Sequence, residues 1–199
     1  PGVAALHNNR GNALRHLGRP EESLASYDRA IALDPLYAAA FENKALLYAN
    51  AQRNEEALAC VERAIALDPT KADPHVIRGV LLRRLGRGQE EIDAYKDAIN
   101  IDPRNVDAWF NQANALSTVN RVLAIQCVDN ALSCDPAYVA AWDLKGTLLS
   151  ELGRGADAVT CHQEAVKLSP RDGRLRYNLG NSWSSIERLE EARESYEAA

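Results

Sequence analysis

The feature that most constrains this chain is a short segment that returns at a nearly fixed interval. Its first copy, residues 30–35, reads Ala-Ile-Ala-Leu-Asp-Pro, and related copies end at Pro69, Pro103, Pro136 and Pro170. The steps between the closing prolines are 34, 34, 33 and 34 residues. A period of this length is typical of arrays in which each repeat is one small supersecondary unit that stacks on the next. We therefore expect an array rather than a domain with a single core.

The same register divides the chain into repeats, whose positions we number as slots, with the closing proline at slot 32. The repeats are residues 4–37, 38–71, 72–105, 106–138, 139–172 and an incomplete 173–199. We expect residues 1–199 to form one array. Because the chain begins with proline and contains no methionine, we also expect it to be part of a longer or processed product.

Small residues recur where two helices would meet. Slot 8 is always glycine or alanine: Gly11, Ala45, Gly79, Ala113, Gly146 and Gly180. Slots 4, 8 and 11 form one stripe of a first helix, and slots 20, 24 and 27 form one stripe of a second. Glycine inside a helix costs about 1 kcal/mol relative to alanine. Its repeated use at slot 8 therefore indicates that the two helices approach each other closely.

Turn signals give the helix bounds. Leu-Gly-Arg segments at 17–19, 85–87 and 152–154 are expected to stop first helices, and the Asp-Pro or Ser-Pro segments are expected to stop second helices. The predicted helices lie near 4–17, 20–33, 38–51, 54–67, 72–85, 88–101, 106–119, 121–134, 139–152, 155–168, 173–186 and 189–198.

These slots resemble those of the tetratricopeptide repeat family, and the resemblance covers nearly the whole chain. It implies an all-α fold, a right-handed α-α superhelix (solenoid) of helix–turn–helix repeats with first helices lining the concave face.

Two repeats depart from the pattern. The fourth lacks one residue in the turn between its two helices. The third has Glu91 at slot 20, where the others have alanine or serine. An ionised carboxylate is costly to bury. Glu91 is therefore expected to reach water or a cation, or to shift the register, and the junction of repeats three and four to be the least regular.

Asparagine is unusually frequent on the expected concave face. The resemblance implies that slots 2, 5, 6, 9, 12 and 13 line a groove, and asparagine occupies slot 6 in four of six repeats. Asparagine is a mediocre helix former, so a ligand-binding use is indicated. The predicted peptide-binding residues are Asn9, Asn12, Asn43, Asn111, Asn114, Asn178 and Asn181, with Arg83 and Arg84 available to an acidic side chain.

A carboxamide offers both donors and an acceptor, so one asparagine can bond the N–H and the C=O of an extended chain. Neighbouring repeats are expected to lie about 10 Å apart, which is the length of about three residues of an extended peptide. About every third peptide residue would therefore meet an asparagine of this ladder. The ladder is interrupted at Ile77 and Leu144. It resembles the asparagine ladder in the repeat arm of the O-linked N-acetylglucosamine transferases, through residues 9–14. The alternatives are that these amides bond only to neighbouring helices, and that the two arginines form a solvated helix end.

Other functional classes are disfavoured. A net charge of −5 argues against nucleic acid as a partner. No apolar run is long enough for a membrane span. Histidines and cysteines lack metal-ligand spacing, and phosphate-loop and nucleophile-elbow motifs are missing, so no metal, cofactor or catalytic activity is expected. The basic residues of a chaperone-tail carboxylate clamp are also missing from the matching slots. Cys60, Cys127 and Cys161 share one slot and are expected to be reduced packing residues in a cytoplasmic protein.

The sequence thus predicts a protein-interaction module that binds an extended peptide in its concave groove. Two alternatives remain open. One is a structural scaffold that forms homo-oligomers through an uncapped last helix pair. The other is the substrate-recognition arm of a larger enzyme, such as a glycosyltransferase.

Overall fold

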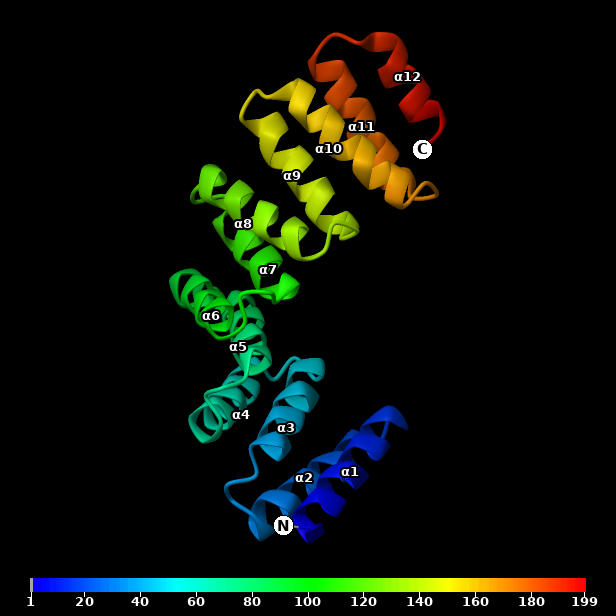
Figure 1. The fold of residues 1–199 in the computed structure, drawn as a ribbon. Coiled ribbons are helices and arrows are strands. Elements are labelled where there is room, and N and C mark those ends of the chain that lie inside the picture. The colour runs from blue at the N-terminus through cyan, green and yellow to red at the C-terminus, as the bar shows by residue number, and fades with distance from the viewer. Residues whose placement is uncertain (1) are drawn as a thin grey trace. The chain divides into compact units, whose positions relative to one another are not determined.

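The computed structural model describes residues 2–199, which form α-helices joined by short turns, with no strand among these residues (Figure 1). The helices are α1 (Gly2–His16), α2 (Pro20–Leu33), α3 (Ala38–Asn50), α4 (Asn54–Leu67), α5 (Ala72–Arg84), α6 (Gly88–Ile101), α7 (Val106–Leu116), α8 (Arg121–Cys134), α9 (Val139–Glu151), α10 (Gly155–Leu168), α11 (Gly173–Ser185) and α12 (Leu189–Glu197). Each predicted repeat forms one pair of packed helices. The predicted helix content and order are confirmed.

The chain divides into two compact units, which are described separately. Unit 1 ends at Pro103 and contains the pairs α1/α2, α3/α4 and α5/α6. Unit 2 is Arg104–Ala199 and contains α7/α8, α9/α10 and α11/α12. In each unit the two helices of a pair pack together, and each second helix also packs against the next first helix. The division lies between repeats three and four. The expectation that this junction is the least regular stays a prediction.

Glycine ends the first helix in three repeats because it adopts a left-handed backbone conformation at little cost. The φ angles of Gly18, Gly86 and Gly153 are 68°, 73° and 73°. Gln52 and Glu187 take the same slot in repeats two and six, with φ angles of 59° and 63°. The fourth repeat has lost a residue from this turn. As a result α7 ends at Leu116, three residues before the predicted end at 119.

The close helix approach predicted from slot 8 is confirmed. A Cβ placed on Gly11 would lie 2.5 Å from Cε1 of Tyr27, and one on Gly79 would lie 2.4 Å from Cε1 of Tyr95. Glycine therefore makes room for a slot-24 aromatic ring. Alanine and aliphatic side chains fill the rest of each core. The three cysteines that share a slot belong to this packing, because Cys127 and Cys161 are buried in unit 2 and Cys60 packs against the core of unit 1.

Glu91 differs from its predicted surroundings. It is only 5% exposed, its Oε1 has no hydrogen-bond partner among residues 2–199, and α6 keeps its regular register. Of the three outcomes expected for Glu91, exposure to water and a shift of register are not found, whereas a nearby cation, Arg83, is. Burial raises the pKa of Glu91, an effect partly opposed by the positive charge of Arg83. Protonation of Glu91 is therefore easier here than in water, because desolvation penalises the charged form.

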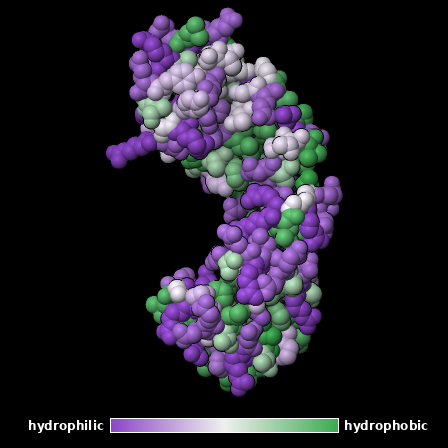
Figure 2. Space-filling model, turned by 180° about the vertical axis from the view of Figure 1, so that it is seen from behind, coloured by the Kyte–Doolittle hydropathy of each residue, from purple (hydrophilic) through white to green (hydrophobic). Residues whose placement is uncertain are grey.

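The surface is mostly hydrophilic, with separate hydrophobic patches on the face shown in Figure 2. Large exposed apolar residues include Leu17 and Leu36 in unit 1, and Val119 and Leu189 in unit 2. No helix within residues 2–199 has both the length and the apolar character needed to cross a membrane.

Candidate functional site

In unit 1 the polar side chains of α1 and α3 bond to each other and to a second helix. Nδ2 of Asn43 donates to Oδ1 of Asn8 over 2.9 Å, which links α3 to α1. The hydroxyl of Tyr27 in α2 donates to Oδ1 of Asn12 over 2.7 Å. Two of the predicted groove residues are thus held in place by internal bonds. Asn8, which the sequence analysis did not select, holds one of them.

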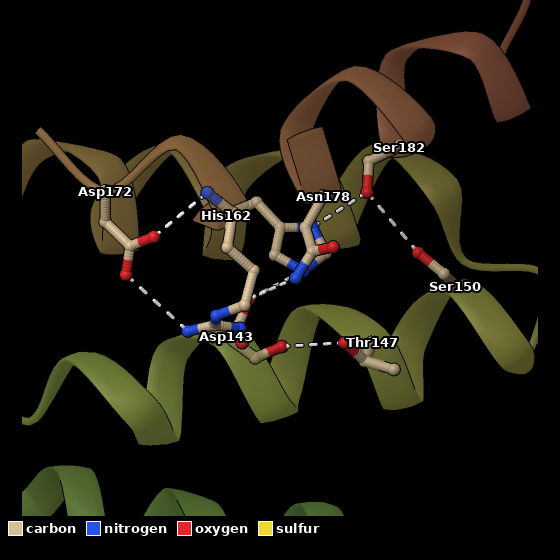
Figure 3. Close-up of polar contacts among 8 residues, drawn as sticks. Asp143, Thr147, Ser150, His162, Asp172, Asn178 and Ser182 are labelled. Carbon is tan, nitrogen blue, oxygen red and sulfur yellow. Dashed lines mark hydrogen bonds and ion pairs between the residues drawn. The ribbon is translucent and has the colours of Figure 1, made fainter. Parts of the chain in front are cut away.

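Unit 2 carries a denser polar cluster on α9, α10 and α11 (Figure 3). Oδ1 of Asp143 accepts a hydrogen bond of 2.8 Å from Nδ2 of Asn178. The other carboxylate oxygen of Asp143 forms an ion pair with Arg174, which lies 3.7 Å from Asp172 as well. A guanidinium group therefore balances the charge of Asp143.

His162 lies next to the carboxylate of Asp143. Its ring is 3% exposed and packs over Gly146, where a Cβ would come within 2.6 Å of Nε2. Nδ1 lies 2.8 Å from Oγ of Ser182, and that oxygen lies 3.4 Å from Oγ of Ser150 (Figure 3). Nε2 lies 3.7 Å from Oδ1 of Asp143 and has no hydrogen bond within the described part of the chain. Burial lowers the pKa of His162, although Asp143 acts in the opposite direction. The imidazole is therefore neutral near pH 7.

A pocket of about 200 Å³ opens beside this cluster. It is lined by Thr147, Ser150 and Glu151 of α9, His162 of α10, and Asn178, Asn181, Ser182 and Ser185 of α11. Oδ1 of Asn181 also accepts a 2.8 Å hydrogen bond from the hydroxyl of Tyr196. The structure thus brings two predicted groove residues, Asn178 and Asn181, into one pocket.

The remaining predicted residues are placed as follows. Asn9 is exposed and Asn111 is half-buried, and neither makes a side-chain hydrogen bond within residues 2–199 that the structure records. Asn114 donates from Nδ2 to the carbonyl oxygen of Phe110 in its own helix over 3.0 Å. Arg83 and Arg84 are both exposed at the end of α5. Arg84 donates to the carbonyl oxygen of Ala49 over 3.0 Å, and it lines a second, polar pocket of about 510 Å³.

The sequence analysis did not select Thr147, Ser150, His162 or Ser182. The available signal was at slot 24, where His162 stands in place of the tyrosine or valine of the other repeats. Ser182, His162 and Asp143 have the residue types of a hydrolytic triad. However, Ser182 is only 2% exposed, so its oxygen cannot reach a substrate carbonyl as it stands. Hydrogen-bonding recognition is the chemistry that this cluster can perform.

Comparison with known proteins identifies the repeats. Family models described as tetratricopeptide repeat match residues 4–37, residues 42–106 and 144–199, and residues 94–126. None of these models indicates a catalytic family. A search of curated proteins found no significant match.

Several solved structures share the fold. PilW, a type IV pilus biogenesis factor, has a TM-score of 0.83 and 17% identity, over 98% of this chain and 91% of PilW. MamA has a TM-score of 0.76 and 18% identity, over 86% of this chain and 94% of MamA. YrrB, described as having an unusual peptide-binding site, has a TM-score of 0.71 and 19% identity, over 92% of this chain and 90% of YrrB. At these identities the likeness shows the fold, and it confirms the all-α repeat architecture.

Proposed function

This chain belongs to the tetratricopeptide repeat family, and on that premise we propose that its first helices bind an extended peptide segment of a protein partner. The repeats support the coarser statement that the chain is a protein-interaction module. The peptide class is supported by YrrB, a protein of the same fold that is described as having a peptide-binding site.

The observation that carries the proposal is that internal bonds hold the groove amides without exhausting them. A carboxamide has two N–H donors and an oxygen with two lone pairs. Asn43 and Asn178 each use one N–H, on Asn8 and Asp143, and so keep a donor and the whole acceptor. Asn12 uses one lone pair and keeps both donors. Each amide can therefore still bond the N–H or C=O of a peptide backbone.

The internal bonds also favour binding in another way. Ordering a free polar side chain at an interface costs about 0.5–1.5 kcal/mol. An asparagine that is already oriented by a neighbour avoids part of that cost. Because a backbone contact is independent of side-chain identity, this mode would tolerate many peptide sequences. Arg83 and Arg84, exposed at the end of α5, would favour an acidic residue of the ligand in unit 1.

A peptide display library of unstructured dodecamers tests the proposal, followed by calorimetry with the selected peptides. Asn43→Ala in unit 1 and Asn111→Ala in unit 2 should each lower the affinity for peptides that bind to the same unit. The expected loss is about tenfold, the effect of one or two lost hydrogen bonds. The matched controls are Asn100→Ala and Asn130→Ala, which remove exposed amides from the second helices α6 and α8. These should leave affinity unchanged.

Failure to select any peptide would overturn the proposal, as would equal losses in the groove and control variants. Two expectations remain predictions: self-association through the last helix pair, and membership in a larger enzyme such as a glycosyltransferase. Sedimentation of the chain over a range of concentrations tests the first of these. A strict monomer would contradict it.

A further inference from the structure

The pocket beside His162 lies where repeat five departs from a pair of residues that repeats one and six share. In repeats one and six a slot-24 tyrosine hydroxyl bonds a slot-9 asparagine, at 2.7 Å for Tyr27 and Asn12 and at 2.8 Å for Tyr196 and Asn181. In repeat five these slots hold His162 and Thr147. The imidazole is shorter than a phenol ring, and the Thr147 hydroxyl donates to the carbonyl oxygen of Asp143 over 3.0 Å. The space that the tyrosine–asparagine pair would fill is left open.

Most of the pocket surface is apolar, and its neutral polar side chains add a few donors and acceptors beside the carboxylate of Glu151. Asn178 keeps its oxygen, because its bond to Asp143 uses Nδ2. Asn181 keeps its two N–H groups, because its bond from Tyr196 uses Oδ1. Ser150 adds a half-buried hydroxyl next to Ser182. A ligand group that both donates and accepts would satisfy these atoms together.

No charge in the lining is without a counter-charge. Glu151 of the lining pairs with Arg121 of α8 at 2.6 Å, and Asp143, which lies beside the pocket, pairs with Arg174. Burial lowers the pKa of His162 and keeps the ring neutral. A charged side chain entering this pocket would lose water and meet no unpaired opposite charge, which is costly. The lining therefore selects against lysine, arginine, aspartate and glutamate.

We propose that this pocket is a subsite for one carboxamide side chain, from glutamine or asparagine, of the peptide bound by unit 2. The inference rests on the proposed peptide-binding function. The pocket volume of about 200 Å³ gives room for one such side chain, compared with about 30 Å³ for one water in the liquid. The carboxamide accepts from Asn181 and donates to the oxygen of Asn178.

Small blocked amino acids test the subsite without the rest of a peptide. N-acetyl-glutamine N-methylamide is titrated into the isotope-labelled chain, and backbone and side-chain amide resonances are followed by NMR. We expect saturable shifts at Ser150, Asn178 and Asn181. The corresponding glutamate and leucine compounds should bind at least about tenfold more weakly, because a site built for hydrogen bonds rejects analogues that leave its groups unpaired. N-acetyl-serine N-methylamide distinguishes a hydroxyl ligand from a carboxamide ligand.

The matched variant is His162→Tyr combined with Thr147→Asn. It restores the tyrosine–asparagine pair of repeats one and six, and Gly146 leaves room for the ring as Gly11 and Gly180 do for Tyr27 and Tyr196. The double variant should remain folded, lose the glutamine-dependent shifts and fill the pocket. If it does not fold, Thr147→Asn alone, at an exposed position, should narrow the opening and weaken the shifts.

Three results would overturn the subsite: no saturable shift with the glutamine compound, equal binding of the glutamine, glutamate, leucine and serine compounds, or unchanged binding by the folded variants. These results are distinguishable from failure of the proposed function. If library peptides bind unit 2 but show no preference for glutamine or asparagine, only the subsite is wrong. If no library peptide binds at all, the peptide-binding function itself is wrong.

Discussion

The hydroxyl of Tyr27 and Oδ1 of Asn12 form a 2.7 Å hydrogen bond that ties α2 to α1. The same relationship recurs at 2.8 Å between Tyr196 and Asn181, on α12 and α11. A residue of the second helix thus orients an asparagine that we propose for peptide binding. Packing within a repeat and the hydrogen-bonding capacity of the groove are coupled through this pair.

The first prediction measures that coupling. Asn12→Ala and Tyr27→Phe should each lower the free energy of unfolding by about 1 kcal/mol, because each removes one side of a partly buried hydrogen bond. The double variant should lose less than the sum of the two, since both substitutions remove the same bond. Urea unfolding of the four proteins checks this. Additive losses would show that the bond contributes nothing to stability.

The second prediction concerns the third repeat, where the tyrosine has no asparagine opposite it. Tyr95 is fully buried, and its hydroxyl has no hydrogen bond among residues 2–199. Slot 9 of this repeat is Val80, so Val80→Asn should supply the missing acceptor at nearly equal helix propensity. We expect a gain of about 0.5–1.5 kcal/mol in the free energy of unfolding. In a Tyr95→Phe background the same substitution should give no gain; an equal gain there would refute this explanation.

The third prediction uses the buried carboxyl group of Glu91. Since burial raises its folded-state pKa above 4.5, Glu91 destabilises the fold at neutral pH, and this effect disappears as the pH falls from the folded pKa through 4.5. Glu91→Ala, which copies slot 20 of repeats two, four, five and six, should therefore stabilise the chain by about 1–3 kcal/mol at neutral pH. The gain should shrink in acid. Thermal unfolding of both proteins across this pH range provides the measurement, and a gain independent of pH would contradict the ionisation argument.

The fourth prediction tests the close approach at slot 8. A Cβ on Gly146 would lie 2.6–2.7 Å from the His162 ring, so Gly146→Ala forces the ring or the helix to move. Overpacking of this kind costs about 1–3 kcal/mol, which exceeds or offsets the helix-propensity gain of about 1 kcal/mol. Gly88→Ala is the control, because nothing lies within 4 Å of the added Cβ. Unfolding experiments should show a lower free energy of unfolding for Gly146→Ala and an unchanged or higher one for Gly88→Ala.

The fifth prediction concerns pH and His162. Burial lowers the folded-state pKa of this histidine below 6.5, so the unfolded chain binds the proton more readily. The contribution of neutral His162 to the free energy of unfolding is therefore fully present above about pH 6.5. It is lost as the pH falls through 6.5 towards the folded-state pKa. The His162→Tyr/Thr147→Asn variant should lose less stability on acidification than the native chain. His75, whose pKa burial also lowers, is present in both proteins and does not affect the comparison. Identical losses would show that His162 does not titrate in this way.

The sequence by itself determined the repeat register, the all-α pairing and most helix bounds. These depend on local signals: apolar periodicity sets each helix stripe, glycine or Asp-Pro ends each helix, and slot 8 reports close packing. The second helices from Pro20–Leu33 to Gly155–Leu168 begin and end where the pattern predicts. Other bounds differ by one or two residues, and the largest departure is the end of α7, because the missing turn residue changed how that helix ends.

Only the tertiary structure decided which partner each polar side chain takes. The Asn43–Asn8 bond joins residues 35 positions apart, and the His162–Ser182 contact joins residues 20 apart. Such pairs depend on the distance and rotation between neighbouring helices, which a periodic pattern leaves open because many side-chain pairings satisfy the same apolar stripe. For the same physical reason, the burial of Glu91 and the pocket beside His162 became visible only once the helices were packed.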